Sequence, residues 1–122
     1  MPIIDVELVA SDGSDLKEHS VAAIADALGK VLGSPPGRTW VRLRVLSSSA
    51  YAENEASLSE DELPVFATVL HRRLPDGAAL VAEVEAITAA IANCLHRKPE
   101  RVHVQYAPAA SGRQAFGGKL VQ

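Results

Sequence analysis

The sequence predicts an α+β fold, a tandem β-α-β repeat with four strands in a mainly parallel or mixed sheet and two helices on one face. Two observations predict it. The order strand, helix, strand occurs twice, and each copy opens on a proline, Pro2 and Pro64, which are 62 positions apart. Residues around the second helical stretch also match residues of the first at a spacing of 63 positions. A fixed spacing of this kind indicates two similar units, one of which gained or lost a residue. The matched pairs are Ile24 with Ile87, Leu28 with Ile91, Leu32 with Leu95, Pro36 with Pro99 and Arg38 with Arg101.

The first copy begins with the apolar strand PIIDVELVA, followed by a polar turn, SDGSD. It continues through the helical stretch LKEHSVAAIADALGKVL and returns in the strand TWVRLRVL. Asp15 and Glu18 are predicted as a capping pair at the start of the helix, and Gly33 predicts its end. The apolar residues at helical spacing are Val21, Ile24, Leu28, Val31 and Leu32.

The second copy begins with PVFATVLHR and passes a turn that contains PDG. It continues through the helical stretch AALVAEVEAITAAIANCL and returns in the strand VHVQYA. Asp76 is the predicted N-cap of this helix, and Pro99 lies beyond its end. The apolar stripe consists of Leu80, Val84, Ile87, Ile91 and Leu95.

Side-chain alternation predicts one covered and one bare face of the sheet. Strands joined by a crossover helix are parallel with a right-handed connection, so both helices fall on the same side. In the predicted strand from Thr39 to Leu46, the apolar set Val41, Leu43 and Val45 opposes the set Trp40, Arg42 and Arg44. Val102 and Val104 likewise oppose His103 and Gln105. A small sheet with one bare face is usually covered by another subunit, which predicts an oligomer.

The bulk composition predicts a single cytoplasmic domain. A length of 122 residues with 48% apolar residues suits one core. We expect repeats over about 2–50 and 64–107, with a polar linker between them. A net charge of −3 with scattered Lys and Arg argues against nucleic acid and polybasic membrane contact. The apolar runs are too short to span a bilayer, and the N-terminus lacks the features of a signal peptide. The single cysteine, Cys94, excludes an intrachain disulfide and a multi-cysteine metal site.

The linker SSSAYAENEASLSEDEL is polar and holds five of the 15 acidic residues. Solvation explains most of these acids. Tyr51 and Glu53 are different, because an aromatic ring and a carboxylate just past the end of a strand can line a pocket. Both are therefore candidate site residues, and a solvated loop is the alternative.

With the repeat established, the chain resembles the tautomerase superfamily, and most closely its longer members, in which two short units are fused. The resemblance is carried by the Met1-Pro2 start, the β-α-β repeat with a second proline at Pro64, the strand TWVRLRVL and the ending AFGGKL. It covers nearly the whole chain and implies a C-terminal hairpin segment over 108–122. It implies a trimer of fused chains, catalysis by the N-terminal proline in a small apolar pocket ringed with arginines, and no metal or organic cofactor.

Proton transfer explains why an N-terminal proline suits this chemistry. A single group can remove and deliver a proton when its pKa lies near the working pH. A prolyl amine is more basic than that, and burial and nearby guanidinium groups lower its pKa. Pro2 has a free amine only if Met1 is removed, whereas Pro64 is an internal imide without a basic lone pair. One catalytic site per chain is expected, with Pro2 as the base.

A small carboxylic acid substrate requires a cation, and arginine binds a planar carboxylate through paired donors. The resemblance places a substrate-binding arginine near the sequence His71-Arg72-Arg73, with Arg72 the best match and Arg73 the second. Ordinary strand-end charges are the alternative. The resemblance also makes Phe116 a candidate for an apolar pocket wall, with interface packing as the alternative.

The sequence departs from the pattern of the short tautomerases at two places. Trp40 and His103 stand where a catalytic arginine is found in that family, and Arg42 lies one pleat further along. The turn SDGSD also lacks the arginine expected after the first strand. These departures argue against a 4-oxalocrotonate-type dicarboxylate and suggest a site walled by Trp40. His103 is either a second acid or base or a structural residue, and His19 is predicted to be solvated.

Two further readings stay open. In the first, an unsaturated or halogenated acid is attacked by water, with Glu53 activating the water and Pro2 acting as the acid. In the second, the chain is a catalytically silent oligomeric scaffold whose terminal proline is unused, as retention of Met1 would require.

Overall fold

The computed structural model describes residues 2–11 and 21–122. The first unit contributes strand β1 (Ile3–Ala10), helix α1 (Val21–Val31) and strand β2 (Trp40–Ser47). The second contributes β3 (Val65–Leu70), α2 (Gly77–Leu95) and β4 (Val102–Tyr106). A short hairpin follows, made of β5 (Ala115–Phe116) and β6 (Lys119–Leu120). Single 3₁₀ turns occupy Ser48–Ala50, Glu60–Glu62 and Pro99–Arg101. The strand predicted from Thr39 to Leu46 is therefore found one residue further along.

The four long strands form one mixed sheet in the order β2-β1-β3-β4. Within each unit the two strands are parallel, as the crossover helices require. The units join at the centre, where β1 and β3 run antiparallel. The predicted four-stranded mixed sheet is thereby confirmed.

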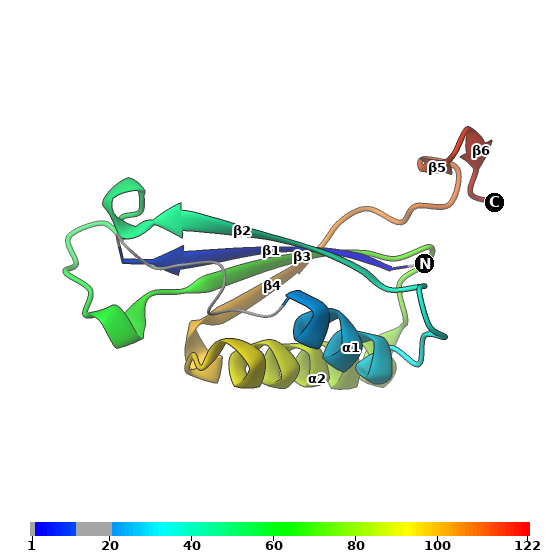
Figure 1. Cartoon of the computed structure of the whole chain (residues 1–122). Helices are drawn as coiled ribbons and strands as arrows, with labels where there is room; N and C mark the ends of the chain where they lie inside the picture. The colour runs from blue at the N-terminus through cyan, green and yellow to red at the C-terminus, as the bar shows by residue number, and fades with distance from the viewer. Residues whose placement is uncertain (1, 12–20) are drawn as a thin grey trace.

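Both helices cover one face of the sheet, and no other described element covers the opposite face, called here the uncovered face (Figure 1). The core lies between these layers, since every second residue along most of the two central strands, β1 and β3, is buried under the helices. From the strands the buried set comprises Ile4, Val6, Leu8, Val65, Ala67, Val69 and Val102, and from the helices Ile24, Leu28, Ile87, Ile91 and Leu95. Val41, Leu43 and Val45 pack against this core, as their alternation predicts.

The helix ends agree with the sequence signals where the structure describes them. Gly33 follows α1 with a φ of 63°, the left-handed conformation that glycine adopts without strain. Asp76 is the N-cap of α2, although its side chain makes no capping hydrogen bond. His96 ends α2 in the left-handed conformation, a position where glycine is usual. The predicted capping pair Asp15 and Glu18, the turn SDGSD and His19 lie outside the described residues.

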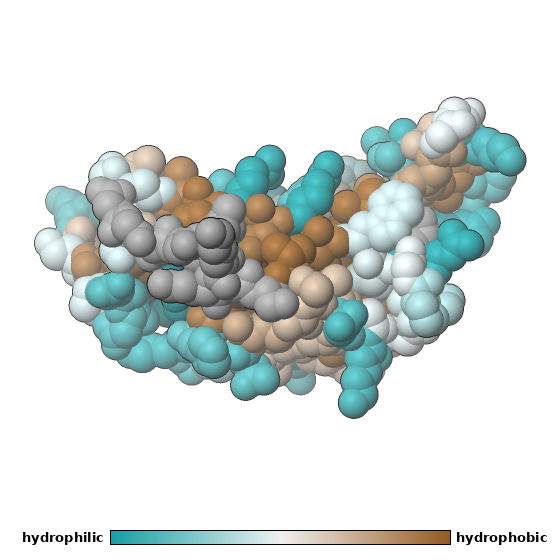
Figure 2. Space-filling model, viewed as in Figure 1, coloured by the Kyte–Doolittle hydropathy of each residue, from teal (hydrophilic) through white to brown (hydrophobic). Residues whose placement is uncertain are grey.

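The uncovered face is a grid of side chains in three rows across the strands. The row next to the start of β1 holds Trp40, Ile3 and Leu70. The middle row holds Arg42, Asp5, Thr68 and Gln105, and the far row Arg44, Glu7, Phe66 and His103. Hydrophilic side chains project above the strands on this side (Figure 2). The face is therefore apolar at one end and charged along most of its length.

Helix α2 is long and apolar enough to cross a membrane by length and composition alone. The prediction that every apolar run is too short to span a bilayer therefore does not hold for this helix. The finding is weak evidence for a membrane span, because core helices pass the same test. In this fold α2 lies along the sheet with Ile87, Ile91, Ala92 and Leu95 buried.

Candidate functional site

Pro2 is buried immediately before β1, where its carbonyl accepts a hydrogen bond from Trp40 N at 3.0 Å. Pro64 is equally buried before β3, and its carbonyl accepts from Val9 N at 3.1 Å. Both prolines therefore extend a strand ladder through their carbonyl groups at a position that needs no N–H donor. Met1, on whose removal the chemistry of Pro2 depends, lies outside the described residues.

The two prolines differ in phase relative to their strands. Pro2 is in phase with Ile4, which lies under the helices, whereas Pro64 is in phase with Phe66, which lies on the uncovered face. The one-residue difference between the repeats accounts for this, because a shift of one residue exchanges the faces of a strand. The twin prolines share a backbone role but have different surroundings.

Trp40 and Phe116 form an aromatic pair at the Pro2 end of the sheet. Their ring centroids are 5.2 Å apart in an edge-to-face arrangement, and Trp40 Nε1 donates to Gly37 O at 2.9 Å. Trp40 remains 46% exposed. The pair connects the C-terminal hairpin to the beginning of β2, which brings two predicted site residues together beside Pro2.

Arg72 and Arg73 follow the end of β3 at the same end of the sheet, because β1 and β3 are antiparallel and Ile3 pairs with Leu70. Both are exposed. Arg72 Nε donates to the main-chain oxygen of Gln122 at 2.7 Å, and Arg72 O accepts from Ser111 N at 3.2 Å. Neither guanidinium forms an ion pair within the described residues, so both positive charges remain uncompensated there.

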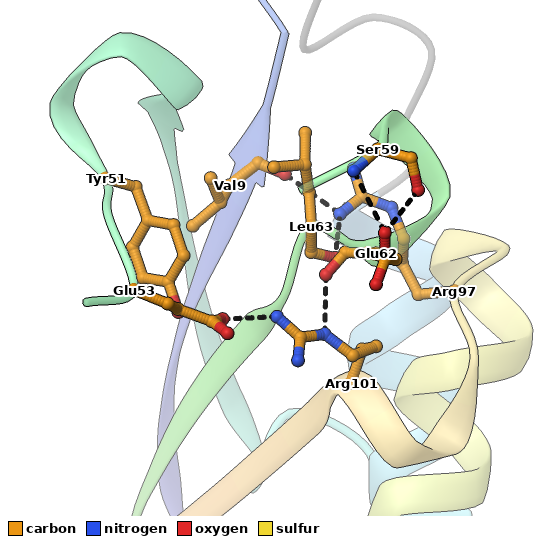
Figure 3. A network of polar contacts seen from close by, with 8 residues as sticks. All are labelled: Val9, Tyr51, Glu53, Ser59, Glu62, Leu63, Arg97 and Arg101. Carbon is orange, nitrogen blue, oxygen red and sulfur yellow. Dashed lines mark hydrogen bonds and ion pairs between the residues drawn. The ribbon is translucent and has the colours of Figure 1, made fainter. Parts of the chain in front are cut away.

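Tyr51 and Glu53 lie at the opposite end of the sheet, where they join a polar network (Figure 3). Tyr51 Oη donates to Glu53 Oε2 at 2.7 Å, and the same oxygen is paired with Arg101. Hydrogen bonds from Tyr51 and then Arg101 hold the pKa of Glu53 below its usual range. Burial, followed by the hydrogen bond to Glu53, raises the pKa of Tyr51. The carboxylate of Glu53 is therefore ionised, and Tyr51 and Arg101 already bind it.

Three further hydrogen bonds, from Arg101 and Arg97, join the linker and β1 to the turn before β4. Arg101 Nε donates to Glu62 O at 2.5 Å. Arg97 donates to Val9 O and to Leu63 O, each at 2.8 Å (Figure 3). The linker between the repeats is thus held in place by two arginines at the start and end of the turn before β4.

His103 also lies far from Pro2 within one chain. Its ring contacts Phe66 at a centroid distance of 5.6 Å, and Phe66 in turn contacts Tyr51 at 5.8 Å. Phe66 pairs with Glu7, which is five positions along β1 from Pro2 and hence about 16 Å away. The structure therefore divides the predicted site residues between the two ends of the sheet.

Arg42 lies between these ends, and its guanidinium is already paired with a carboxylate. It makes two hydrogen bonds to Asp5, at 2.5 and 2.8 Å, in the bidentate arrangement that suits arginine and carboxylate. Arg42 thus has an internal partner for its charge, in contrast to Arg72 and Arg73.

A cluster that the sequence did not predict joins three elements next to the Pro2 end. Glu83 Oε2 of α2 accepts from Tyr106 Oη at 2.8 Å and lies 2.9 Å from His71 Nε2. The His71 and Tyr106 rings are stacked at 6.0 Å. Burial, followed by the hydrogen bond to Glu83, raises the pKa of Tyr106. No local spacing signals this cluster, because the three residues come from the end of β3, the middle of α2 and the end of β4.

Within residues 2–11 and 21–122, no three His, Cys, Asp or Glu side chains gather in a way that could hold a metal ion.

No protein-family model matches the chain, and no curated protein matches it significantly in sequence. Solved structures do match it over nearly its whole length. Pt0534, solved after inactivation by 2-oxo-3-pentynoate, has a TM-score of 0.74 and 13% identity, covering 97% of this chain and 94% of its own. Macrophage migration inhibitory factor from Oncomelania hupensis has a TM-score of 0.73 and 22% identity, covering 100% and 83%. Native fused 4-OT has a TM-score of 0.70 and 18% identity, covering 97% and 94%.

Other matching structures include fused 4-OT solved as asymmetric and symmetric trimers, malonate semialdehyde decarboxylase, and a member of the cis-3-chloroacrylic acid dehalogenase family. At these low sequence identities the matches are evidence for the fold alone. They agree with the resemblance carried by the Met1-Pro2 start, the tandem repeat and the C-terminal hairpin. The chain has the fold of the tautomerase superfamily.

Proposed function

We propose that the chain is a cofactor-independent, cytoplasmic enzyme of the tautomerase type, in which Pro2 acts as the general base and acid. Its substrate is a small enol, α-keto or unsaturated carboxylic acid. The observation that carries this proposal is the position of Pro2, buried at the head of β1 and at the same end of the sheet as Arg72 and the Trp40–Phe116 pair.

The reaction requires one group that both removes a proton from the substrate and delivers a proton to it. With Met1 removed, the neutral Pro2 amine accepts the proton of the enol hydroxyl, and the O–H electrons form the new carbonyl bond. The electrons of the C=C bond then take the proton back from Pro2 at carbon. Burial and the uncompensated charges of Arg72 and Arg73 both disfavour the protonated amine, which moves its pKa toward neutrality.

The substrate carboxylate is assigned to Arg72, with Arg73 as a second cation, and Trp40 and Phe116 form an apolar wall. In the chain, Arg72 Nε donates to the main-chain oxygen of Gln122, so the substrate carboxylate would bind the terminal nitrogens of this guanidinium or displace that contact. The name of one matching structure, Pt0534 inactivated by 2-oxo-3-pentynoate, refers to a 2-oxo compound, which supports an α-keto acid as the substrate class.

A homotrimer is part of the proposal, supported by the trimers solved for fused 4-OT. The outer edges of β2 and β4 and the hairpin that stands away from the sheet are surfaces through which copies can join (Figure 1). The uncompensated charges on the uncovered face would be costly to bury against a dry surface. Tyr51, Glu53, Arg42 and His103 would reach a Pro2 site only from a partner copy.

A second candidate is hydration or dehalogenation of an unsaturated acid. It is favoured by the matches to a decarboxylase described with hydratase activity and to a dehalogenase family member. It requires Glu53 to activate water, but in the chain this carboxylate is paired with Arg101 and accepts from Tyr51. If Met1 is retained, neither chemistry operates, and the chain is a silent scaffold.

Ketonisation of phenylenolpyruvate tests the proposal, with Pro64→Ala as the matched control for Pro2→Ala. Loss of a positioned general base costs about 10²- to 10⁴-fold in rate. Pro2→Ala is expected to lose activity on that scale, whereas Pro64→Ala keeps the activity of the wild type. Equal rates in the wild type and Pro2→Ala would favour the silent scaffold, and hydration of an unsaturated acid without ketonisation would favour the second candidate.

A further inference from the structure

Three polar side chains meet between helix α2 and the ends of two strands, and the proposed function gives them no role. Glu83 of α2 lies against His71, which follows β3, and against Tyr106, which ends β4. Glu83 Oε2 accepts from Tyr106 Oη at 2.8 Å and is 2.9 Å from His71 Nε2. The side chains of His71 and Glu83 are each only 15% exposed. These three residues form a largely shielded group, called here the Glu83 cluster.

Glu83 is the acceptor on which this cluster depends. A carboxylate only accepts hydrogen bonds, so the hydrogen between Glu83 and His71 is assigned to His71 Nε2. Tyr106 donates to the same oxygen, and its ring is stacked on that of His71 with centroids 6.0 Å apart. Removal of the acceptor would leave two half-buried donors unpaired, which costs more than the net value of one hydrogen bond. The His71 ring is therefore held in place through Glu83.

The Glu83 cluster adjoins Pro2. In the antiparallel pairing of β1 with β3, Ile3 lies opposite Leu70. Continued by one position, this register sets His71 opposite Pro2. Both positions are in phase with strand residues that are buried under the helices, and the contact of His71 with α2 agrees with that side of the sheet. The cluster therefore lies at the end of the sheet where the catalytic base is proposed.

The main chain at His71 and Arg72 is held as well. His71 O accepts from Ala110 N at 2.8 Å, and Arg72 O accepts from Ser111 N at 3.2 Å. Ala110 is itself buried. Two anchors therefore determine where the Arg72 side chain begins: main-chain hydrogen bonds to the C-terminal segment, and the contact of the His71 ring with α2. Only the second anchor can be removed by a single side-chain substitution.

We propose that Glu83 is a positioning residue of the Pro2 site, an inference that rests on the proposed function. By binding His71 it fixes the end of β3, so that Arg72 presents its terminal nitrogens to the substrate carboxylate beside Pro2. A side chain binds more weakly when its attachment point moves, because more conformational freedom is lost on binding. The carboxylate is unchanged during proton transfer, so the placement of Arg72 affects the ground state and the transition state alike. Loss of Glu83 therefore raises KM and leaves kcat nearly unchanged.

Ketonisation of phenylenolpyruvate by Glu83→Met measures this effect, with Glu85→Met as the matched control. Glu83→Met is expected to raise KM about 3- to 10-fold, the net value of one hydrogen bond, and to change kcat by less than about twofold. Glu85 is exposed on the same helix, so Glu85→Met removes the same charge and is expected to keep the wild-type KM. Glu83→Gln retains an acceptor oxygen and is expected to show a smaller rise in KM. In an Arg72→Met background, Glu83→Met is expected to raise KM no further, because both residues act through one interaction.

Isothermal titration with 3-phenylpropionate, a saturated carboxylate that can be neither tautomerised nor hydrated, gives a readout that needs no catalysis. Wild type and Pro2→Ala are expected to bind it, whereas Glu83→Met and Arg72→Met are expected to bind it more weakly. If Pro2→Ala keeps the wild-type rate of ketonisation, the proposed base is wrong. Binding of 3-phenylpropionate that depends on Glu83 and Arg72 would still support the positioning role in that case.

Two results would overturn the proposal. One is a Glu83→Met protein with the KM and the affinity of Glu85→Met and only a lowered urea midpoint, which would make the cluster purely stabilising. The other is an additive rise in KM when Glu83→Met and Arg72→Met are combined, which would show that Glu83 does not act through Arg72. Circular dichroism identifies a variant that fails to fold. If Glu83→Met fails, His71→Leu makes the same test with the same expected rise in KM, because it releases the end of β3 and leaves Glu83 its donor Tyr106.

Discussion

The two ends of the sheet use their arginines in different ways. At the linker end, Arg101 is paired with Glu53, and Arg97 binds the carbonyl oxygens of Val9 and Leu63. At the Pro2 end, Arg72 donates through Nε to the main-chain oxygen of Gln122, but the remaining donors of its guanidinium and those of Arg73 have no carboxylate partner among the described residues. Under the proposed function, the linker end is structural and the Pro2 end binds the substrate.

Exchanging one arginine at each end separates the two roles most clearly. A charge-assisted hydrogen bond contributes about 1.5–3 kcal/mol, so Arg72→Met is expected to raise KM for an acidic substrate by roughly 10- to 100-fold. Arg101→Met, which leaves Glu53 without its cation, is expected to lower stability and leave KM unchanged. Steady-state kinetics and urea unfolding of both variants measure the two effects.

An unchanged KM in Arg72→Met would remove this residue from the site. Arg73→Met then becomes the informative variant, because Arg73 is the second exposed cation in the same segment. If only Arg101→Met raised KM, the linker end would be the chemical end, and the comparison would be reversed.

A substitution of Arg97 tests whether the arginines at the linker end stabilise the fold. In Arg97→Met, Val9 O and Leu63 O lose a shared donor at a partly buried position, which is expected to cost about 1–3 kcal/mol in the free energy of unfolding. Lys98→Met is the control, since its pair with Asp61 is largely exposed and such pairs contribute little. Equal urea midpoints for wild type and Arg97→Met would contradict the anchoring role.

The aromatic pair at the Pro2 end is expected to contribute less. A double-mutant cycle of Trp40→Ala and Phe116→Ala is expected to give a coupling energy of about 0.5–1.5 kcal/mol in unfolding experiments. If the pair also walls the site, each single variant raises KM for an aromatic substrate. Additive effects on stability would show that the hairpin does not rest on Trp40.

The smallest expected effect is a change in pH dependence at the linker end. Glu53 has a lowered pKa in the folded protein, so the unfolded state binds more protons in the acid range. Stability from this group is therefore complete above the ordinary pKa of a glutamate and is lost as the pH falls through the lowered value. Glu53→Gln is expected to give a shallower loss of stability on acidification. The measurement is the urea midpoint of wild type and Glu53→Gln from neutral pH into the acid range. Parallel profiles of the two proteins would contradict the expectation.

The fold was largely predictable because its signals are local and repeated. The alternation of Val41 with Arg42, the helical spacing of Ile87 and Ile91, and Gly33 at a helix end each depend on neighbouring residues only. The twin prolines then showed that the pattern occurs twice. Periodicity of this kind determines which face of each element is buried, and the core follows from it.

The grouping of site residues was less predictable, because it depends on contacts between distant positions. Glu53 was a candidate for activating water, but its partner Arg101 is 48 positions away. Nothing in the linker sequence indicates that pairing. Glu83 is similarly joined to His71 and Tyr106 only through the packing of α2 on the sheet. Sequence patterns identified the residue types, whereas the register of the sheet determined which of them meet.

The central claim is that the Pro2 end is reactive because it carries a free secondary amine. The intact mass of the protein isolated from its own cells tests this most directly. The account predicts a mass lower than that of the full sequence by one methionine residue, which leaves the Pro2 nitrogen free. A mass that includes Met1 would contradict it, because the peptide bond would acylate that nitrogen and remove the base.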